Sequence, residues 1–303
     1  MFKRMRSAGY NPLTNDFSEV DSDVSSDLPQ IMWHITDRCP LACPYCFATK
    51  TSHEASLEQV PDIVATMLLL NVRKVDIAGG EPLVYPHLPE LVLALGEAKL
   101  PVTITTSGAA TSGNRDWLVS NAALFTRVIV SLDAPPQQHD SMRGREGAFD
   151  AAVQIIDKIQ QSGYKHVRVN TVLTRVALEP TYAQAMATLI GRIGPEEWCL
   201  IQPHPANKKR GFDDYAITDQ EFAEIVRTLQ GISIKSAASS KILSRKVSDY
   251  SGYWVLYPNG ILRRHSDGPA DVSELHFDPQ NVTEIRTAVR KYGISLPLRA
   301  SRS

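Results

Sequence analysis

Residues 33–47 read WHITDRCPLACPYCF, and this stretch decides the fold. Three of the four cysteines in the 303-residue chain lie in it, at Cys39, Cys43 and Cys46. The apolar residues 30–35 predict a buried strand, so the cysteines fall on the loop that follows it. Three thiolates from one loop can bind three irons of a [4Fe–4S] cluster and leave the fourth iron open. The spacing therefore predicts a metal centre.

Two alternatives compete with the cluster. A structural zinc ion could take these cysteines together with His34 or His53, because zinc sites are tetrahedral. The cysteines could also be structural, with no metal bound. We favour the cluster because the spacing, the preceding strand and the aromatic Tyr45 before the third cysteine agree.

The bulk composition argues against several classes of protein. A net charge of −1 and a single dense basic cluster, Lys208 to Arg210, give no sign of nucleic-acid binding. Clustered cysteines do not resemble the disulfide framework of a secreted protein. We find no signal peptide and no apolar run long enough to cross a membrane. We therefore expect a cytoplasmic protein.

Strands and helices alternate along the middle of the chain. Apolar runs predict six strands, at residues 30–35, 74–78, 102–106, 127–132, 167–173 and 198–202. The intervening segments have helical periodicity, which implies a parallel sheet with right-handed crossovers. We expect an α/β fold, a partial (β/α)6 TIM-like barrel whose active site lies at the carboxyl ends of the strands.

The flanking segments differ in composition from this core. Residues 1–28 are polar and predict a flexible N-terminal arm, whereas 29–203 form the barrel. Residues 204–303 predict a small α+β extension with a helix from Thr218, a hairpin around residues 258–260 and a last helix. We expect this extension to close the open side of the barrel. Residues 236–249 give no assignable pattern.

A second motif, Gly79-Gly80-Glu81-Pro82, follows the second predicted strand. Glycines let the backbone approach a ligand closely, and Glu81 adds charge. Cys-x3-Cys-x2-Cys with this motif at this distance resembles the radical S-adenosylmethionine (SAM) enzymes. The resemblance covers residues 30–203.

The resemblance implies both cofactors and their contacts. A [4Fe–4S] cluster would bind Cys39, Cys43 and Cys46, and its open iron would bind SAM. Reductive cleavage of SAM would give a 5′-deoxyadenosyl radical that abstracts hydrogen from a small molecule. A donor such as flavodoxin or ferredoxin would supply the electron, with no nucleic-acid or membrane partner. The expected SAM contacts are Tyr45, Gly79, Gly80, Glu81, Pro82, Thr106, Ser107, Ser131, Asp133 and Arg143.

Within this superfamily, residues 46–52, 167–172 and 253–256 resemble viperin-like nucleotide dehydratases. That family has basic residues beside the sixth-strand tryptophan, whereas Glu197 and Cys199 flank Trp198 here. The departures favour a less anionic or partly cationic substrate, such as a nucleoside, a sugar or an amino-acid-derived metabolite. One remaining cysteine cannot hold an auxiliary cluster.

The remaining candidates are expected near the mouth of the barrel. Candidate substrate contacts are Arg168, Asn170, Arg175, Glu197, Gln202 and His204. Tyr253 and Cys199 are candidate catalytic hydrogen donors, although each also fits a buried core position. We thus predict a radical SAM lyase or oxidoreductase acting on a nucleoside- or sugar-like molecule. The alternatives are a nucleoside triphosphate dehydratase and a non-catalytic zinc-binding protein.

Overall fold

The computed structural model describes residues 28–46, 48, 52–110, 113–205, 211–235, 240–250, 253–265 and 274–292. The predicted arm, apart from Leu28, and the basic cluster at residues 208–210 lie outside this described part.

The described residues form a ten-stranded sheet with the order β10-β9-β8-β1-β2-β3-β4-β5-β6-β7. The six predicted strands are confirmed and pair in parallel in chain order, which confirms the partial barrel. They are β1 (Gln30–His34), β2 (Lys74–Ala78), β3 (Val102–Thr106), β4 (Arg127–Ser131), β5 (Val167–Val172) and β6 (Glu197–Ile201).

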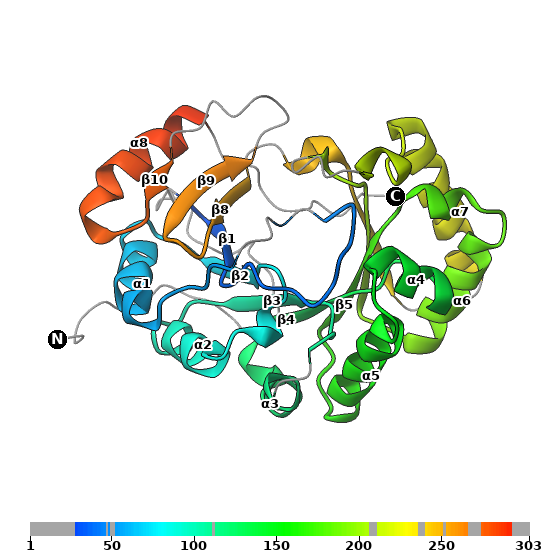
Figure 1. The fold of residues 1–303 in the computed structure, drawn as a ribbon, viewed down its shortest axis with the longest axis horizontal. Helices are drawn as coiled ribbons and strands as arrows, with labels where there is room; N and C mark the ends of the chain where they lie inside the picture. The colour runs from blue at the N-terminus through cyan, green and yellow to red at the C-terminus, as the bar shows by residue number, and fades with distance from the viewer. Residues whose placement is uncertain are drawn as a thin grey trace.

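Helices cover the outer face of the curved sheet (Figure 1). They are α1 (Val60–Leu69), α2 (Leu88–Glu97), α3 (Asn114–Ser120), α4 (Pro136–Arg143), α5 (Ala148–Gln161) and α6 (Tyr182–Ile193). α5 buries Ile155, Ile156 and Ile159 along one stripe, as expected of a helix with one apolar face. The sequence pattern did not predict α4, because most of its residues are polar.

The C-terminal extension adds strands at both edges of the six-stranded core, namely β7 beside β6, and β8, β9 and β10 beside β1. β7 (Lys241–Arg245) pairs in parallel with β6 and falls within the segment that had no assignable pattern. The predicted hairpin is confirmed as β8 (Tyr253–Leu256) and β9 (Ile261–His265), and β8 pairs in parallel with β1. Since β7 and β8 are the parallel strands at opposite ends of the barrel, the seam between them is the open side.

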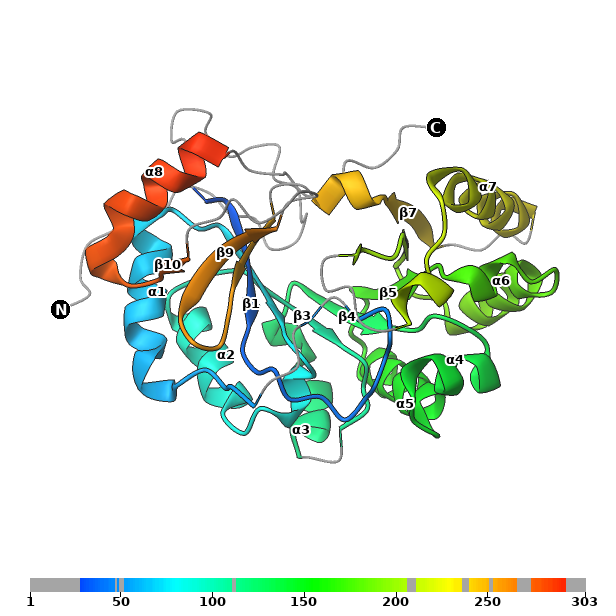
Figure 2. The same ribbon diagram turned by 45° about the horizontal axis from the view of Figure 1, so that its top comes forward.

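The remaining elements pack outside these edge strands. α7 (Asp219–Lys235) lies against α6, whereas β10 (Leu275–His276) and α8 (Val282–Tyr292) flank the hairpin at the opposite end of the arc (Figure 2). None of the helices in the described ranges is both long and apolar enough to cross a membrane.

Alternate residues of each strand face opposite sides of the sheet. In β1, Ile31 and Trp33 are fully buried in the core beneath the helices, whereas Met32 and His34 line an internal cavity. The same alternation in the other strands decides which side chains face the interior of the barrel.

Candidate active site

A cavity of about 470 Å³ occupies the interior of the barrel. Its wall at the carboxyl end of the strands includes Cys39, Cys43, Cys46, Gly79 and Gly80. Its opposite wall is made by the first residues of several strands, namely Gln30, Lys74, Arg127, Glu197, Lys241 and Tyr253. The two predicted motifs thus lie at one end of a single interior space.

The three clustered cysteines lie where each could bind one iron of a cluster. All are free thiols, and all three line the cavity. In the described part of the chain, no group of three His, Cys, Asp or Glu could hold one metal ion, as a zinc site requires. Each iron of a cluster takes its own thiolate, so the sulfur atoms need not converge on one point.

The glycines of the second motif bring it against the cysteine loop. Gly80 N donates to Thr36 O at 2.7 Å, and Glu81 N donates to Arg38 O at 2.9 Å. Gly79 has φ +143°, and a Cβ at Gly80 would lie 2.2 Å from Arg38 O. We expected these glycines to admit a ligand, but their closest neighbour is the backbone leading to Cys39.

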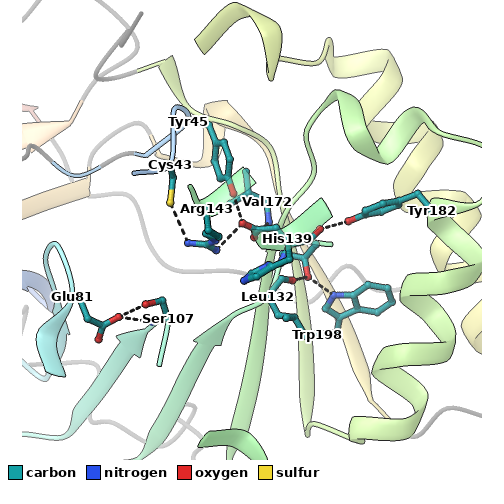
Figure 3. Close-up of polar contacts among 12 residues, drawn as sticks. Cys43, Tyr45, Glu81, Ser107, Leu132, His139, Arg143, Val172, Tyr182 and Trp198 are labelled. Atoms are coloured by element: carbon teal, nitrogen blue, oxygen red, sulfur yellow. Dashed lines mark hydrogen bonds and ion pairs between the residues drawn. The ribbon is translucent and has the colours of Figure 1, made fainter. Parts of the chain in front are cut away.

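The carboxylate of Glu81 is buried, and its hydrogen bonds connect the Gly79–Pro82 motif to the end of β3. It accepts hydrogen bonds from Ser107 Oγ and from Ser107 N at 2.7 Å (Figure 3). It also accepts from Thr106 Oγ1 and from Leu83 N at 3.2 Å. Thr106 and Ser107 line the cavity, whereas Glu81 and Pro82 lie behind the wall. The structure therefore places Glu81 as a positioning residue for the two hydroxyls.

Asp133, just after β4, connects three elements around the cysteine loop. Its Oδ2 accepts from Tyr45 Oη at 2.6 Å and pairs with Arg143 Nη2 at 2.6 Å. Its Oδ1 accepts from Val172 N at 2.9 Å. The side chain is fully buried and lies outside the cavity wall, so in this structure Asp133 supports the residues around the cysteine loop and does not face the cavity.

Arg143, at the end of α4, reaches the cysteine loop itself. Its Nη1 lies 3.8 Å from Cys43 Sγ, and its guanidinium lies 6.0 Å from the Tyr45 ring centroid (Figure 3). Burial raises the pKa of the Cys43 thiol, and the positive charge of Arg143 opposes that rise. Arg143 thus favours the thiolate form of Cys43, which is the form in which a cysteine can bind a metal.

A neutral histidine, His139, accepts a hydrogen bond from the backbone of Asp133. Asp133 N donates to His139 Nδ1 at 3.1 Å, and Asp133 O accepts from Tyr182 Oη at 2.6 Å. Burial and the nearby Arg143 lower the pKa of His139 to about 4. The imidazole therefore acts as an uncharged acceptor.

Two other expected contacts face the middle of the cavity. Ser131 of β4 and Asn170 of β5 are register partners, and both line the wall. Asn170 Oδ1 is buried and has no hydrogen-bond donor among the described residues. A buried acceptor of this kind fits a hydroxyl or amino group of a bound ligand.

The structure corrects the expected position of Arg168 and Glu197. They lie at the amino ends of β5 and β6, not near the mouth, and they pair with each other. Arg168 Nε donates to Glu197 Oε2 at 2.7 Å, and Arg127 Nη1 lies 3.4 Å from the same oxygen. Two cations therefore neutralise the acid on which the expectation of a less anionic substrate depended.

Tyr253 lies at the seam of the barrel. It lines the cavity at the start of β8, and Gln30 Nε2 lies 3.5 Å from its hydroxyl. The Arg245 guanidinium lies 5.5 Å from its ring centroid, although β7 and β8 share no backbone pairing. Burial raises the pKa of Tyr253, so the phenol keeps its proton.

The four remaining candidate residues do not all lie on the cavity wall. Gln202 and His204 are buried in the wall, and the Gln202 amide bonds to Asp219 and Val247 N. Arg175 is exposed and lies off the wall. Cys199 is buried behind the wall against Leu243, which does not favour a role as hydrogen donor.

Sequence analysis missed four basic residues of the wall, which are Lys74, Arg127, Lys241 and Arg245. The alternation of Lys241, Leu243 and Arg245 was a usable signal, because a strand would direct all three to one side. We did not predict β7 because the residues around it are mostly polar and give no apolar run.

Comparison with known proteins identifies the barrel. Residues 33–179 match the model of the radical SAM superfamily. The chain is 27% identical over 225 residues to an S-adenosylmethionine-dependent nucleotide dehydratase of Lacinutrix mariniflava, which covers 68% of this chain and 45% of that protein. A protein of the same name from Flammeovirga pacifica is 25% identical over 214 residues, which cover 66% of this chain and 71% of that one.

A solved structure agrees at the level of the fold. SuiB of Streptococcus suis, bound to S-adenosylmethionine, superposes with a TM-score of 0.69 at 15% identity over 86% of this chain and 68% of that one. A [4Fe–4S] cluster and SAM are the cofactors characteristic of the superfamily, so the predicted family, fold and cofactor class are confirmed. Residues 33–179 therefore form a radical SAM domain.

Proposed function

We propose that this protein binds a [4Fe–4S] cluster through Cys39, Cys43 and Cys46 and uses it to cleave SAM. When bound, the cluster and SAM would supply a 5′-deoxyadenosyl radical. The observation that carries the proposal is that all three thiols share one interior cavity with Gly79 and Gly80. The substrate would occupy the rest of this cavity.

The residues of the chain would have separate tasks around these cofactors. Arg143 would stabilise the Cys43 thiolate, and Asp133 would hold Arg143 and Tyr45 in place. Thr106 and Ser107, which Glu81 positions, would bind SAM hydroxyls, while Ser131 and Asn170 would contact the nucleoside or the substrate. The barrel wall would exclude water from the reacting atoms.

The net reaction fits a lyase or an oxidoreductase. Tyr253 is a candidate hydrogen donor, because its protonated hydroxyl lies on the cavity wall. A low-potential electron donor such as flavodoxin or ferredoxin in the reducing cytoplasm would supply the electron for the reductive cleavage of SAM.

Metal content and SAM cleavage test the proposal. Anaerobically purified protein should contain close to one [4Fe–4S] cluster per chain and should release 5′-deoxyadenosine and methionine from SAM with dithionite. Colourless protein with one zinc ion per chain would contradict it and favour the non-catalytic alternative.

A second candidate is the dehydration of a nucleoside triphosphate. The names of the two relatives and the basic residues of the cavity wall favour it. Incubation with each ribonucleoside triphosphate, with mass spectrometry for loss of water, tests it. Unchanged triphosphates beside active SAM cleavage would remove this candidate alone.

A further inference from the structure

Arg143 is joined to the cysteine loop by its backbone as well as by its side chain. Ala42 N donates to Arg143 O at 2.9 Å, and Arg143 Nη1 lies 3.8 Å from Cys43 Sγ. Gly144, the next residue, has φ +64°, and a Cβ there would lie 3.0 Å from Ala42 Cβ. The glycine therefore lets the end of α4 approach the residue that precedes Cys43.

The guanidinium of Arg143 is buried, and its nitrogen atoms have different surroundings. Nη2 pairs with Asp133 Oδ2 at 2.6 Å, whereas Nη1 faces Cys43 Sγ (Figure 3). Nε is buried and has no hydrogen-bond acceptor among the described residues, so it stays available to a ligand in the cavity that Arg143 lines. The contact with Cys43 is therefore compatible with the SAM contact that the resemblance implies for Arg143.

Asp133 has a hydrogen-bond partner at every polar atom, so it can hold this guanidinium in one orientation. Its carboxylate accepts from Tyr45 Oη at 2.6 Å and from Val172 N at 2.9 Å, besides its pair with Arg143. Its backbone N–H and C=O bond to side chains of α4 and α6. A side chain with partners on so many elements is suited to position another residue.

The residue before Asp133 is held by a second set of buried hydrogen bonds. Trp198 Nε1 donates to Thr171 Oγ1 at 2.9 Å, and Thr171 Oγ1 donates to Leu132 O at 2.7 Å (Figure 3). None of these three residues lines the cavity. They fix the segment after β4 beside the cysteine loop and leave the ligand space to other residues.

We propose that Arg143, positioned by Asp133, raises the reduction potential of the cluster that Cys43 would help to bind. Reduction by one electron from an external donor adds one negative charge to such a cluster and no proton. A positive charge or a hydrogen bond at a ligand sulfur stabilises the reduced form, and Arg143 would supply both at Cys43. This inference rests on the proposed function and adds to it the residues that control the reduction.

The charges around Cys43 agree with the direction of this effect. Burial has the largest influence on the pKa of Cys43 and raises it. The positive charge of Arg143 lowers that pKa by more than the negative charge of Asp133 raises it. The pair therefore acts as a net positive charge at this sulfur.

A redox titration of the cluster in the full chain, purified anaerobically and free of SAM, tests this inference. Electron paramagnetic resonance measures the reduced cluster at each potential. Arg143→Gln should make one-electron reduction about tenfold less favourable, the loss expected for one charge-assisted contact, which lowers the midpoint potential by about 59 mV. Arg143→Lys keeps the charge but not the planar fork that contacts two groups, so reduction should be about threefold less favourable.

Asp133→Asn distinguishes positioning from simple charge. The amide keeps the shape of the carboxylate but forms no ion pair with Arg143. If Asp133 acts through Arg143, this change should lower the potential of the wild type but not that of Arg143→Gln. If Asp133 acts only by its negative charge, the change would raise the potential equally in both backgrounds, which would overturn its role as a positioning residue.

Arg145→Gln is the matched control for loss of a nearby cation. Arg145 is partly exposed, and its guanidinium lies 3.5 Å from Ala109 O instead of facing a cysteine, so this change should shift the potential much less than Arg143→Gln. Iron analysis of each variant shows whether the cluster is retained. If Arg143→Gln loses its iron, the comparison of Arg143→Lys with the wild type decides in its place.

Equal potentials of the wild type and the Arg143 variants would overturn the inference. SAM cleavage by that same wild-type protein would then leave the proposed function intact. Wild-type protein without a cluster would overturn both.

Discussion

The two ends of the cavity differ in how their polar groups are satisfied. At the cysteine end, the buried carboxylates of Glu81 and Asp133 accept hydrogen bonds or ion pairs at both oxygens. At the seam, the single carboxylate of Glu197 contacts both Arg127 and Arg168, and Lys241 is exposed on the cavity wall. Buried polar groups that satisfy one another suit the positioning of a resident cofactor, whereas an exposed side chain on the wall stays available to a ligand that enters and leaves.

Loss of a cysteine would test the cysteine end most severely. Because each thiolate would bind its own iron in the proposed cluster, Cys39→Ala should lower iron content and reduce SAM cleavage at least ~100-fold. Iron analysis and 5′-deoxyadenosine release measure both effects. Cys199→Ala, which changes a cysteine behind the wall, should keep its iron. Full SAM cleavage by Cys39→Ala would refute the cluster assignment.

Gly80→Ala tests whether the two loops at this end form one unit. The added methyl group would lie 2.2 Å from Arg38 O, so the cysteine loop must shift. We expect a loss of about 1–3 kcal/mol in the free energy of unfolding, with lower iron content. Denaturant unfolding and iron analysis measure these changes.

Gly96→Ala in α2 is the matched control for that substitution. A Cβ there meets no atom within 4 Å, so alanine should be neutral or stabilising by up to ~1 kcal/mol. Equal stability of the two variants would show that the loops do not depend on their close approach.

Most of the cysteine end could be predicted from sequence because its signals are local. The cysteine spacing and Gly79-Gly80 each occupy a few consecutive residues, and the first six strands follow apolar runs. The roles of Glu81 and Asp133 as internal supports could not be predicted. Glu81 reaches Thr106, which lies 25 residues further along the chain, and Asp133 reaches Val172 and Tyr45, which lie 39 and 88 residues away.

The seam was harder to predict because it depends on long-range pairing. Glu197 resembles a free acid in the sequence, and only the register of β4, β5 and β6 shows that Arg127 and Arg168 neutralise it. β7 has too few apolar residues to be recognised without β6 beside it. The preference for a less anionic substrate was therefore drawn from an incomplete set of charges.

The pH dependence of the free energy of unfolding tests the contribution of His139, which hydrogen-bonds to the backbone of Asp133 at the cysteine end. The pKa of folded His139, about 4, lies below its ordinary value of 6.5, so the unfolded chain binds the proton more readily. This contribution to stability is present above pH 6.5 and is lost as the pH falls toward 4. Between pH 7 and pH 5 the loss should be about 2 kcal/mol.

Denaturant unfolding of wild type and His139→Asn at both pH values measures this contribution. The asparagine carbonyl can accept from Asp133 N without titrating, so the variant should lose much less stability at pH 5. His87→Asn, at an exposed position, should retain the wild-type dependence. A wild-type dependence in His139→Asn would show that the support behind Asp133 does not depend on an uncharged histidine.

The smallest predicted effect decides between two interpretations of Glu197. If the second candidate function holds and the basic side chains around Glu197 bind a triphosphate, Glu197→Gln removes a repelling charge and frees donors of Arg168, so pyrophosphate should bind about threefold more tightly. Glu196→Gln removes the exposed neighbouring acid, which also contacts Arg127, and should change affinity less. If Glu197 instead bound a cationic part of the substrate, anion affinity would stay the same or fall, because Arg168 would lose the partner that orients it. The sign of this change therefore shows whether Glu197 belongs to the wall or to the ligand site.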